Sequence, residues 1–300
     1  MGQVWAKSMH RIPILGDVPQ ASALNSMSDA EKVELARSPF VRQLHATAGT
    51  LVTTIRWSYV HATLGTQRWR NGSAFFLDID GRIIAITAAH VLRLYQEGKQ
   101  MARGRIACQL GDLTFDPEAR LIDVNDGIDI ATFNVTADEF AQIGKQAFAV
   151  PASDWPPPHP ATTRPGRPGL TGYFAGFPED ARLWINSWAM SFGLYVAGGP
   201  IGSATERQIS MPFERQYWVD TLGLGFPPTG FDPGGISGGP MMMPLERDGV
   251  WSFHLAGVIS EFPPSVLGVE TVIAAPAHFI AADGRINANS APIRFAEPAA

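Results

Sequence analysis

The sequence predicts an all-β protein, and three observations carry that prediction. The 300 residues include 30 glycines and 24 prolines, which is more turn chemistry than a helical protein carries. From Gly49 onward, short runs of β-branched and aromatic residues alternate with turn residues, a texture typical of strands. Asp80-Gly81 separates the apolar runs 74–77 and 83–86 and favours a β-hairpin there.

The first 48 residues depart from this texture and predict helices. Ser28 and Glu31 have the spacing of a capping box, and apolar residues follow at helical intervals as far as Leu44. Pro39 is expected to interrupt the helix. We therefore interpret residues 1–48 as a helical N-terminal extension that docks on the body of the protein.

The remainder divides at a segment dense in proline, residues 151–168. Such a segment cannot be a central strand or a helix interior, and it predicts an extended linker between two halves, 49–150 and 169–300. Docking to a proline-recognising partner is the alternative for this segment. The strands that we predict in the two halves are 51–55, 74–77, 83–86, 105–110, 119–124, 129–135, 170–177, 183–194, 217–219, 251–259 and 269–274.

Charge and hydropathy narrow the expected partners and location. The formal net charge of −5 argues against a nucleic-acid partner, and apolar runs such as 83–89 are too short to span a membrane. Cys108 is the single cysteine and is expected to be a buried small hydrophobe, because it cannot form an internal disulfide. The first residues show no secretory signal, so we expect a cytoplasmic protein.

Three short motifs contain residues suited to catalysis. Ser237 is enclosed by glycines, which leave a hydroxyl open to approach and permit the turn that points amide N–H groups at a developing oxyanion. His90 follows an apolar strand among small residues, and Asp129 stands at the mouth of another strand. Taken singly, the serine could belong to a flexible turn, the histidine could be structural, and the aspartate is weak evidence of a site.

Taken together, the motifs resemble those of the trypsin-like, or chymotrypsin-fold, serine proteases. Thr87-Ala88-Ala89-His90, Asp129-Ile130-Ala131 and Gly235-Ile236-Ser237-Gly238-Gly239-Pro240 are similar to the histidine, aspartate and nucleophile motifs of that family, in the same order. The phrases Gly72-Ser73-Ala74-Phe75-Phe76 and Gly176-Phe177-Pro178 resemble segments of bacterial stress proteases and glutamyl endopeptidases.

The resemblance covers about residues 49–285 and implies both a fold and an activity. The fold would be two consecutive six-stranded antiparallel β-barrels that meet at the proline-rich segment. The activity would be that of a serine endopeptidase with the triad His90, Asp129 and Ser237, acting on a protein or peptide substrate without a cofactor or metal. The backbone N–H groups of Gly235 and Ser237 would form the oxyanion hole.

Two residues near the motifs qualify this picture. Asp126 competes with Asp129, but it lies in an Asn-Asp-Gly turn and is expected to be solvated. Ile236 stands where zymogen-derived members of the family have an aspartate, so we expect no activation by cleavage.

The substrate pocket is implied less directly. The resemblance assigns Phe231 to the pocket base and Ser260, Glu261 and Phe262 to the strand that pairs with substrate. The two phenylalanines would narrow and dry the pocket, which favours Ala, Val or Leu before the scissile bond, because an unpaired charge is costly to bury. Two alternatives stay open: Asp232 turned into the pocket would favour Arg or Lys, and His254 would favour Glu.

Other classes of function also remain open at this point. The chain could be a catalytically silent trypsin-fold protein that binds a partner or serves as a scaffold. It could also be an unrelated two-sheet β protein with coincidental motifs. The oligomeric state is not predicted by the sequence.

Overall fold

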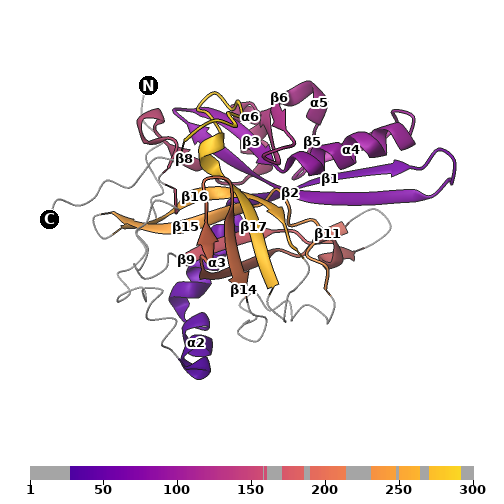
Figure 1. Cartoon of the computed structure of the whole chain (residues 1–300). Helices are drawn as coiled ribbons and strands as arrows, with labels where there is room; N and C mark the ends of the chain where they lie inside the picture. The colour runs from indigo at the N-terminus through magenta and orange to yellow at the C-terminus, as the bar shows by residue number, and fades with distance from the viewer. Residues whose placement is uncertain are drawn as a thin grey trace, which may run out of the picture.

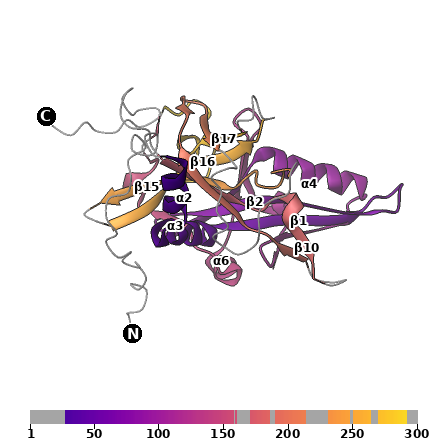
Figure 2. The ribbon, with the colours of Figure 1, turned by 90° about the horizontal axis from the view of Figure 1, so that it is seen from below.

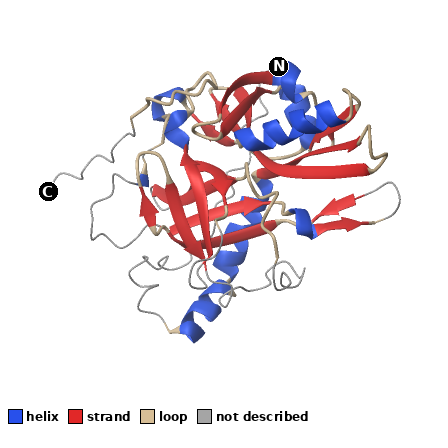
Figure 3. Cartoon of the chain, turned by 45° about the vertical axis from the view of Figure 1, so that its right-hand side comes forward, coloured by secondary structure: helices blue, strands red, loops and turns tan. Residues whose placement is uncertain are grey.

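The computed structural model describes residues 28–157, 159–160, 171–185, 190–213, 231–247, 250–263 and 270–291. Within these residues the chain forms two large sheets, with helices lying at their margins (Figures 1 and 3). The predicted strand 217–219 lies outside the described residues.

Two helices precede the sheets, as the sequence predicts. Helix α2 spans Asp29–Ala36 and α3 spans Pro39–Thr50. The capping box is confirmed: Glu31 N–H donates to Ser28 Oγ at 3.4 Å, and Ser28 N–H donates to the Glu31 carboxylate at 2.7 Å. Pro39 begins α3, a position where its missing N–H breaks no helical hydrogen bond. Leu44 of α3 is buried in the core, so this helix docks on the sheets (Figure 2).

The first sheet contains eight strands. They are β1 (Val52–Val60), β2 (Gln67–Ile79), β3 (Arg82–Thr87), β4 (Ile106–Leu110), β5 (Leu113–Thr114), β6 (Leu121–Asn125), β7 (Ile130–Asn134) and β8 (Phe148–Val150). Their order is β5-β4-β1-β2-β3-β7-β6, and β8 pairs in parallel with β2. The predicted hairpin is β2–β3, where Asp80 and Gly81 have φ of 50° and 85°, the left-handed conformation that an Asp-Gly turn adopts.

Three helices accompany this sheet. They are α4 (Ala89–Met101), which lies along β1 (Figure 1), α5 (Pro117–Arg120) and α6 (Ala137–Ile143). The sheet and α4 enclose an apolar cluster that contains Cys108. Burial raises the pKa of the Cys108 thiol to about 12, which agrees with the prediction of a buried, unreactive cysteine.

The second sheet contains seven strands. They are β9 (Thr171–Gly176), β12 (Tyr195–Pro200), β13 (Ser203–Ala204), β14 (Ile209–Phe213), β15 (Pro240–Arg247), β16 (Val250–Glu261) and β17 (Glu270–Pro276), in the order β12-β9-β15-β16-β17-β14-β13. A separate hairpin pairs β10 (Arg182–Trp184) with β11 (Met190–Phe192), and short 3-10 turns form at η1 (Ala152–Asp154), η3 (Glu179–Ala181) and η5 (Ala277–Phe279).

The observed architecture is therefore mostly β, with several differences from the predicted elements. Residues 119–124 begin in α5 rather than in a strand, and 183–194 form parts of two strands instead of one. The described strands form sheets of eight and seven strands, and the closure of two six-stranded barrels stays a prediction.

The two sheets share one apolar core. A single buried cluster takes Phe75 and Leu77 from β2, Tyr173 from β9, Met242 from β15 and Val258 from β16. The described start of the proline-rich segment packs against this body, since the Trp155 indole N–H donates to the Ile280 carbonyl at 2.7 Å. No helix among the described residues is long and apolar enough to cross a membrane.

Candidate active site

His90 and Asp129 meet because β3 and β7 are paired. Thr87, the last residue of β3, pairs with Ala131 near the start of β7, so the chain enters α4 beside the loop that precedes β7. His90 Nδ1 lies 2.8 Å from Asp129 Oδ2, and the His90 backbone N–H donates to Asp129 Oδ1 at 2.9 Å. One carboxylate thus fixes both the ring and the first turn of α4, where the helix dipole favours a negative charge.

The backbone of Asp129 is itself unusual. Its φ of 62° is left-handed, a conformation uncommon in residues other than glycine and better tolerated by aspartate and asparagine than by bulkier side chains. The turn is closed by the Asp129 N–H, which donates to the Asn125 carbonyl at 2.8 Å. Asp126, the competing carboxylate, instead forms an ion pair with Arg93 and has a side chain that is 71% exposed. The carboxylate that contacts His90 is therefore that of Asp129 and not that of Asp126.

The loop that carries Ser237 lies against the segment that leads to His90. Gly238 has a φ of 85°, and a Cβ atom there would lie 2.1 Å from Thr87 Oγ1 and 2.9 Å from the Ala88 nitrogen. The Ser237 carbonyl accepts a hydrogen bond from the Ser73 N–H at 2.9 Å. A Cβ atom on Gly72 would contact both Val91 of α4 and the Ser237 carbonyl, so the loop of Ser237 and the first turn of α4 approach each other over β2.

The Ser237 hydroxyl is partly exposed and donates to the Ser260 carbonyl at 3.5 Å. Among the described residues no hydrogen bond joins Ser237 to His90. Hydrogen bonds between a nucleophile and its base are often long in unliganded enzymes and tighten only with substrate.

Two peptide groups beside Ser237 are held by their carbonyl ends. The Gly234 carbonyl accepts from the Glu179 N–H at 2.6 Å, and the Ile236 carbonyl accepts from the Gly239 N–H at 2.9 Å. The N–H groups at the other ends of these peptides belong to Gly235 and Ser237, and neither donates to an acceptor within the described ranges. A fixed pair of donors without an acceptor is the arrangement that stabilises a developing oxyanion.

Sequence reasoning did not assign a role to Ser73, although the structure gives it several contacts with this loop. Its Oγ donates to the Gly235 carbonyl at 2.8 Å and accepts from the Phe177 N–H at 2.9 Å. Its own carbonyl accepts from Thr87 Oγ1 at 2.6 Å. The side chain is fully buried, and its hydrogen bonds join the first sheet to the loop of Ser237. The only signal in the sequence is the likeness of residues 72–76 to a protease segment.

The predicted pocket residues fall in two places. Phe231 is buried with its ring 6.0 Å from that of Tyr195, and the Phe262 ring lies 5.8 Å from that of Phe174. Ser260 contacts Ser237 directly through its carbonyl. Glu261, the last residue of β16, is exposed. Phe231 and Phe262 are thus packed on aromatic residues of the second sheet.

The two residues that would favour a charged substrate are placed as follows. Asp232 is exposed, and its Oδ1 accepts the Gly234 N–H at 2.8 Å, so one carboxylate oxygen is used within its own turn. His254 is partly buried on β16, where it pairs with Met243 of β15. Neither placement decides between a charged and an uncharged preference.

The described part of the chain contains no group of three or more His, Cys, Asp and Glu residues that could hold a metal ion. When the chain is compared with protein-family models and with curated proteins, neither comparison gives a match.

Proposed function

We propose that this protein is a serine endopeptidase in which His90, Asp129 and Ser237 act as a catalytic triad. The observation that carries the proposal is the double contact of the Asp129 carboxylate with His90, beside a glycine-rich loop that presents Ser237. Asp129 Oδ2 accepts the Nδ1 proton, which leaves Nε2 of the neutral ring as the basic nitrogen. The likeness of three motifs to those of trypsin-like proteases adds support, and it implies that each sheet belongs to a β-barrel.

The reaction would proceed in two halves. The Ser237 oxygen attacks the carbonyl carbon of the scissile peptide while its proton passes to His90 Nε2. The Gly235 and Ser237 N–H groups stabilise the oxyanion, the C–N bond breaks, and His90 returns the proton to the leaving amine. A water molecule then attacks the ester, gives its proton to His90, and releases the carboxylate product as the proton returns to Ser237.

A fluorophosphonate probe tests this proposal directly. It reacts with serines that an adjacent base activates, so labelling is expected at Ser237 and is expected to disappear in Ser237→Ala. Ser58→Ala, on β1, serves as the control and should be labelled like the wild type. A folded wild type that takes up no probe would contradict the proposal and favour a silent binding or scaffold protein. Labelling that survives Ser237→Ala would contradict the assignment of the nucleophile.

A further inference from the structure

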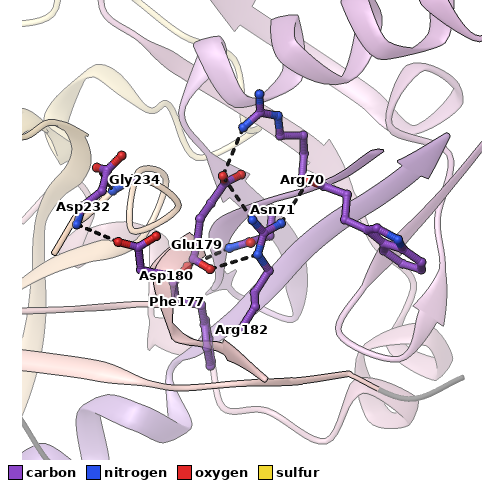
Figure 4. Close-up of polar contacts among 9 residues, drawn as sticks. Arg70, Asn71, Phe177, Glu179, Asp180, Arg182, Asp232 and Gly234 are labelled. Carbon is purple, nitrogen blue, oxygen red and sulfur yellow. Dashed lines mark hydrogen bonds and ion pairs between the residues drawn. The ribbon is translucent and has the colours of Figure 1, made fainter. Parts of the chain in front are cut away.

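A second group of polar contacts lies against the loop of Ser237 and comes from the segment after β9 (Figure 4). From this group we propose that Arg182 and Asp180 are positioning residues for the oxyanion donors. They would hold segment 177–181 in a position from which the Glu179 N–H can orient the Gly234–Gly235 peptide. This inference rests on the proposed protease activity, because it concerns the Gly235 N–H.

The first step concerns the peptide itself. In a trans peptide the N–H points away from the C=O, so the 2.6 Å hydrogen bond from the Glu179 N–H to the Gly234 carbonyl directs the Gly235 N–H away from Glu179. Residues 234 and 235 are both glycines, and Gly235 has a φ of 93°, so side chains do little to restrict rotation of this peptide. Its orientation therefore depends on contacts from outside the loop.

The second step concerns what fixes Glu179. Arg182 donates from Nε to the Glu179 carbonyl at 2.9 Å and from Nη2 to the Glu179 carboxylate at 3.3 Å. Its Nη1 donates to the Trp69 carbonyl of β2 at 3.0 Å. One guanidinium thus ties η3 to the first sheet, and its planar fork suits this multiple contact. Arg70 adds an ion pair with Glu179 at 3.1 Å, but its side chain is 53% exposed, so we assign it little weight.

The third step concerns the start of the loop. Asp180 Oδ2 accepts the Asp232 N–H at 3.0 Å, and Asp232 Oδ1 accepts the Gly234 N–H at 2.8 Å (Figure 4). The segment after β9 therefore holds the loop at residues 232 and 234. Ile236, in the same loop, is buried and apolar and offers no side-chain hydrogen bond. The polar anchors of residues 232–235 come instead from Asp180, the Glu179 N–H and Ser73.

The test separates orientation of the donors from general stability. Phosphonylation of Ser237 by the fluorophosphonate would be measured for Arg182→Ala, Arg182→Lys, Asp180→Ala and Asp180→Asn, with the maximal rate constant and the probe affinity determined separately. Thermal melts would give the folded fraction of each variant. Arg120→Ala is the matched control, because Arg120 is a partly buried arginine that pairs with Glu139 between α5 and α6, away from the loop.

We expect Arg182→Ala to lower the maximal rate constant by about 10-fold to 100-fold with probe affinity unchanged, since removal of one oxyanion donor outright costs about 10²-fold to 10³-fold. Arg182→Lys should be intermediate, because an ammonium group cannot reach all three acceptors in the same geometry. Asp180→Ala should also slow the reaction, whereas Asp180→Asn should restore it, because the amide oxygen still accepts the Asp232 N–H. Arg120→Ala should lower the melting temperature and leave the rate constant unchanged.

Several results would overturn the inference. Wild-type rate constants in both alanine variants would do so, and so would an equal loss in Arg120→Ala or a loss that only follows the folded fraction. If Arg182→Ala does not fold, the Asp180 pair decides, because that side chain lies at the surface. A wild type that does not react with the probe would overturn the proposed protease activity itself and this inference with it, an outcome distinct from a reactive wild type with unaffected variants.

Discussion

At the scale of single residues, the carboxylate of Asp129 has two tasks. Its Oδ2 contacts the imidazole and its Oδ1 accepts the backbone N–H at the start of α4, so side chain and helix are oriented together. An amide at this position keeps the size of the group but loses one acceptor. The amide N–H of an asparagine would donate to His90 Nδ1. The ring would then carry its own proton on Nε2, the nitrogen that serves as the base in the proposed reaction.

We accordingly predict that Asp129→Asn lowers kcat by a factor of the order of 10⁴ without unfolding the protein. The matched variant Asp126→Asn removes a carboxylate that pairs with Arg93 at the surface and should leave turnover unchanged. Steady-state kinetics on a cleaved peptide and circular dichroism of both variants provide the measurement. An active Asp129→Asn together with an inactive Asp126→Asn would show that the other carboxylate is the catalytic one.

Gly238 gives a prediction about stability. A methyl group there would lie 2.1 Å from Thr87 Oγ1 and 2.3 Å from the Ser73 carbonyl, in addition to the strain of a φ of 85°. Gly104 has a similar φ of 83°, but a Cβ atom there meets nothing within 4 Å. Gly104→Ala should therefore lower the free energy of unfolding by about 1–2 kcal/mol, the cost of a left-handed backbone alone. Gly238→Ala should lower it considerably more, because the added methyl group also clashes with its neighbours. Urea denaturation compares the two, and equal unfolding midpoints would contradict the packing seen at Gly238.

Among the secondary-structure elements, the sequence predicted correctly those turns and helix caps that depend on only a few neighbouring residues. Asp80-Gly81 predicts the β2–β3 hairpin, and Ser28 with Glu31 predicts the start of α2. Strand β15 is absent from the strands that we predicted, and it contains Pro240 and Pro244. Both prolines pair with β16, opposite Val258 and Phe253, whereas β9 pairs only with Met241 and Met242 and requires no N–H from either proline.

Some residues of the candidate site could likewise be predicted from local sequence patterns, and others could not. His90 and Asp129 were predictable because each stands at the end of an apolar strand in a phrase with a known likeness. Ser73 and Arg182 were not, because the contacts that give them a role, with Gly235 and with the Trp69 carbonyl, join residues more than 100 positions apart. Contacts of this kind arise from how the sheets pack, and no local pattern in the sequence reports them.

Strand β16 and the residue Phe231 give a prediction about cleavage. Phe231 and Phe262 are packed on aromatic residues of the second sheet, and a pocket next to them would be narrow and dry. We therefore expect Ala, Val or Leu before the scissile bond, since a charged side chain there would be buried without a partner. Cleavage-site profiling of a mixed peptide library measures the preference. A dominant Arg or Lys would point to Asp232, and a dominant Glu would point to His254.

At the scale of the whole molecule, two buried histidines make stability depend on pH. His159 and His278 are 2% and 3% exposed, and their rings lie edge to face with centroids 5.0 Å apart. Burial, and then the neighbouring His278, lowers the pKa of His159 to about 4. Burial also lowers the pKa of His278, which the charge of Glu206 opposes.

The unfolded chain therefore binds protons more readily than the folded one as the pH falls below the ordinary histidine pKa of about 6.5. The contribution of this pair to stability should be complete above that pH and should decline as the pH falls towards 4. Urea unfolding midpoints at pH 7.5 and 4.5 should show this decline, and His278→Phe should weaken it. His61→Phe, which replaces a partly buried histidine outside this pair, is the control. An identical pH dependence in wild type and His278→Phe would contradict the role of the pair.

The burial of Cys108 has a practical consequence for work on the intact molecule. It is the only cysteine in the chain, and its thiol lies inside the first sheet with a pKa of about 12. Only a thiolate attacks maleimides and disulfide reagents, so the buried Cys108 of the folded protein is expected not to react with them. A dye or spin label could be attached at one introduced surface cysteine, such as Leu64→Cys in the turn between β1 and β2, without first removing the natural one. The rate at which Cys108 becomes reactive would then measure how often the first sheet opens.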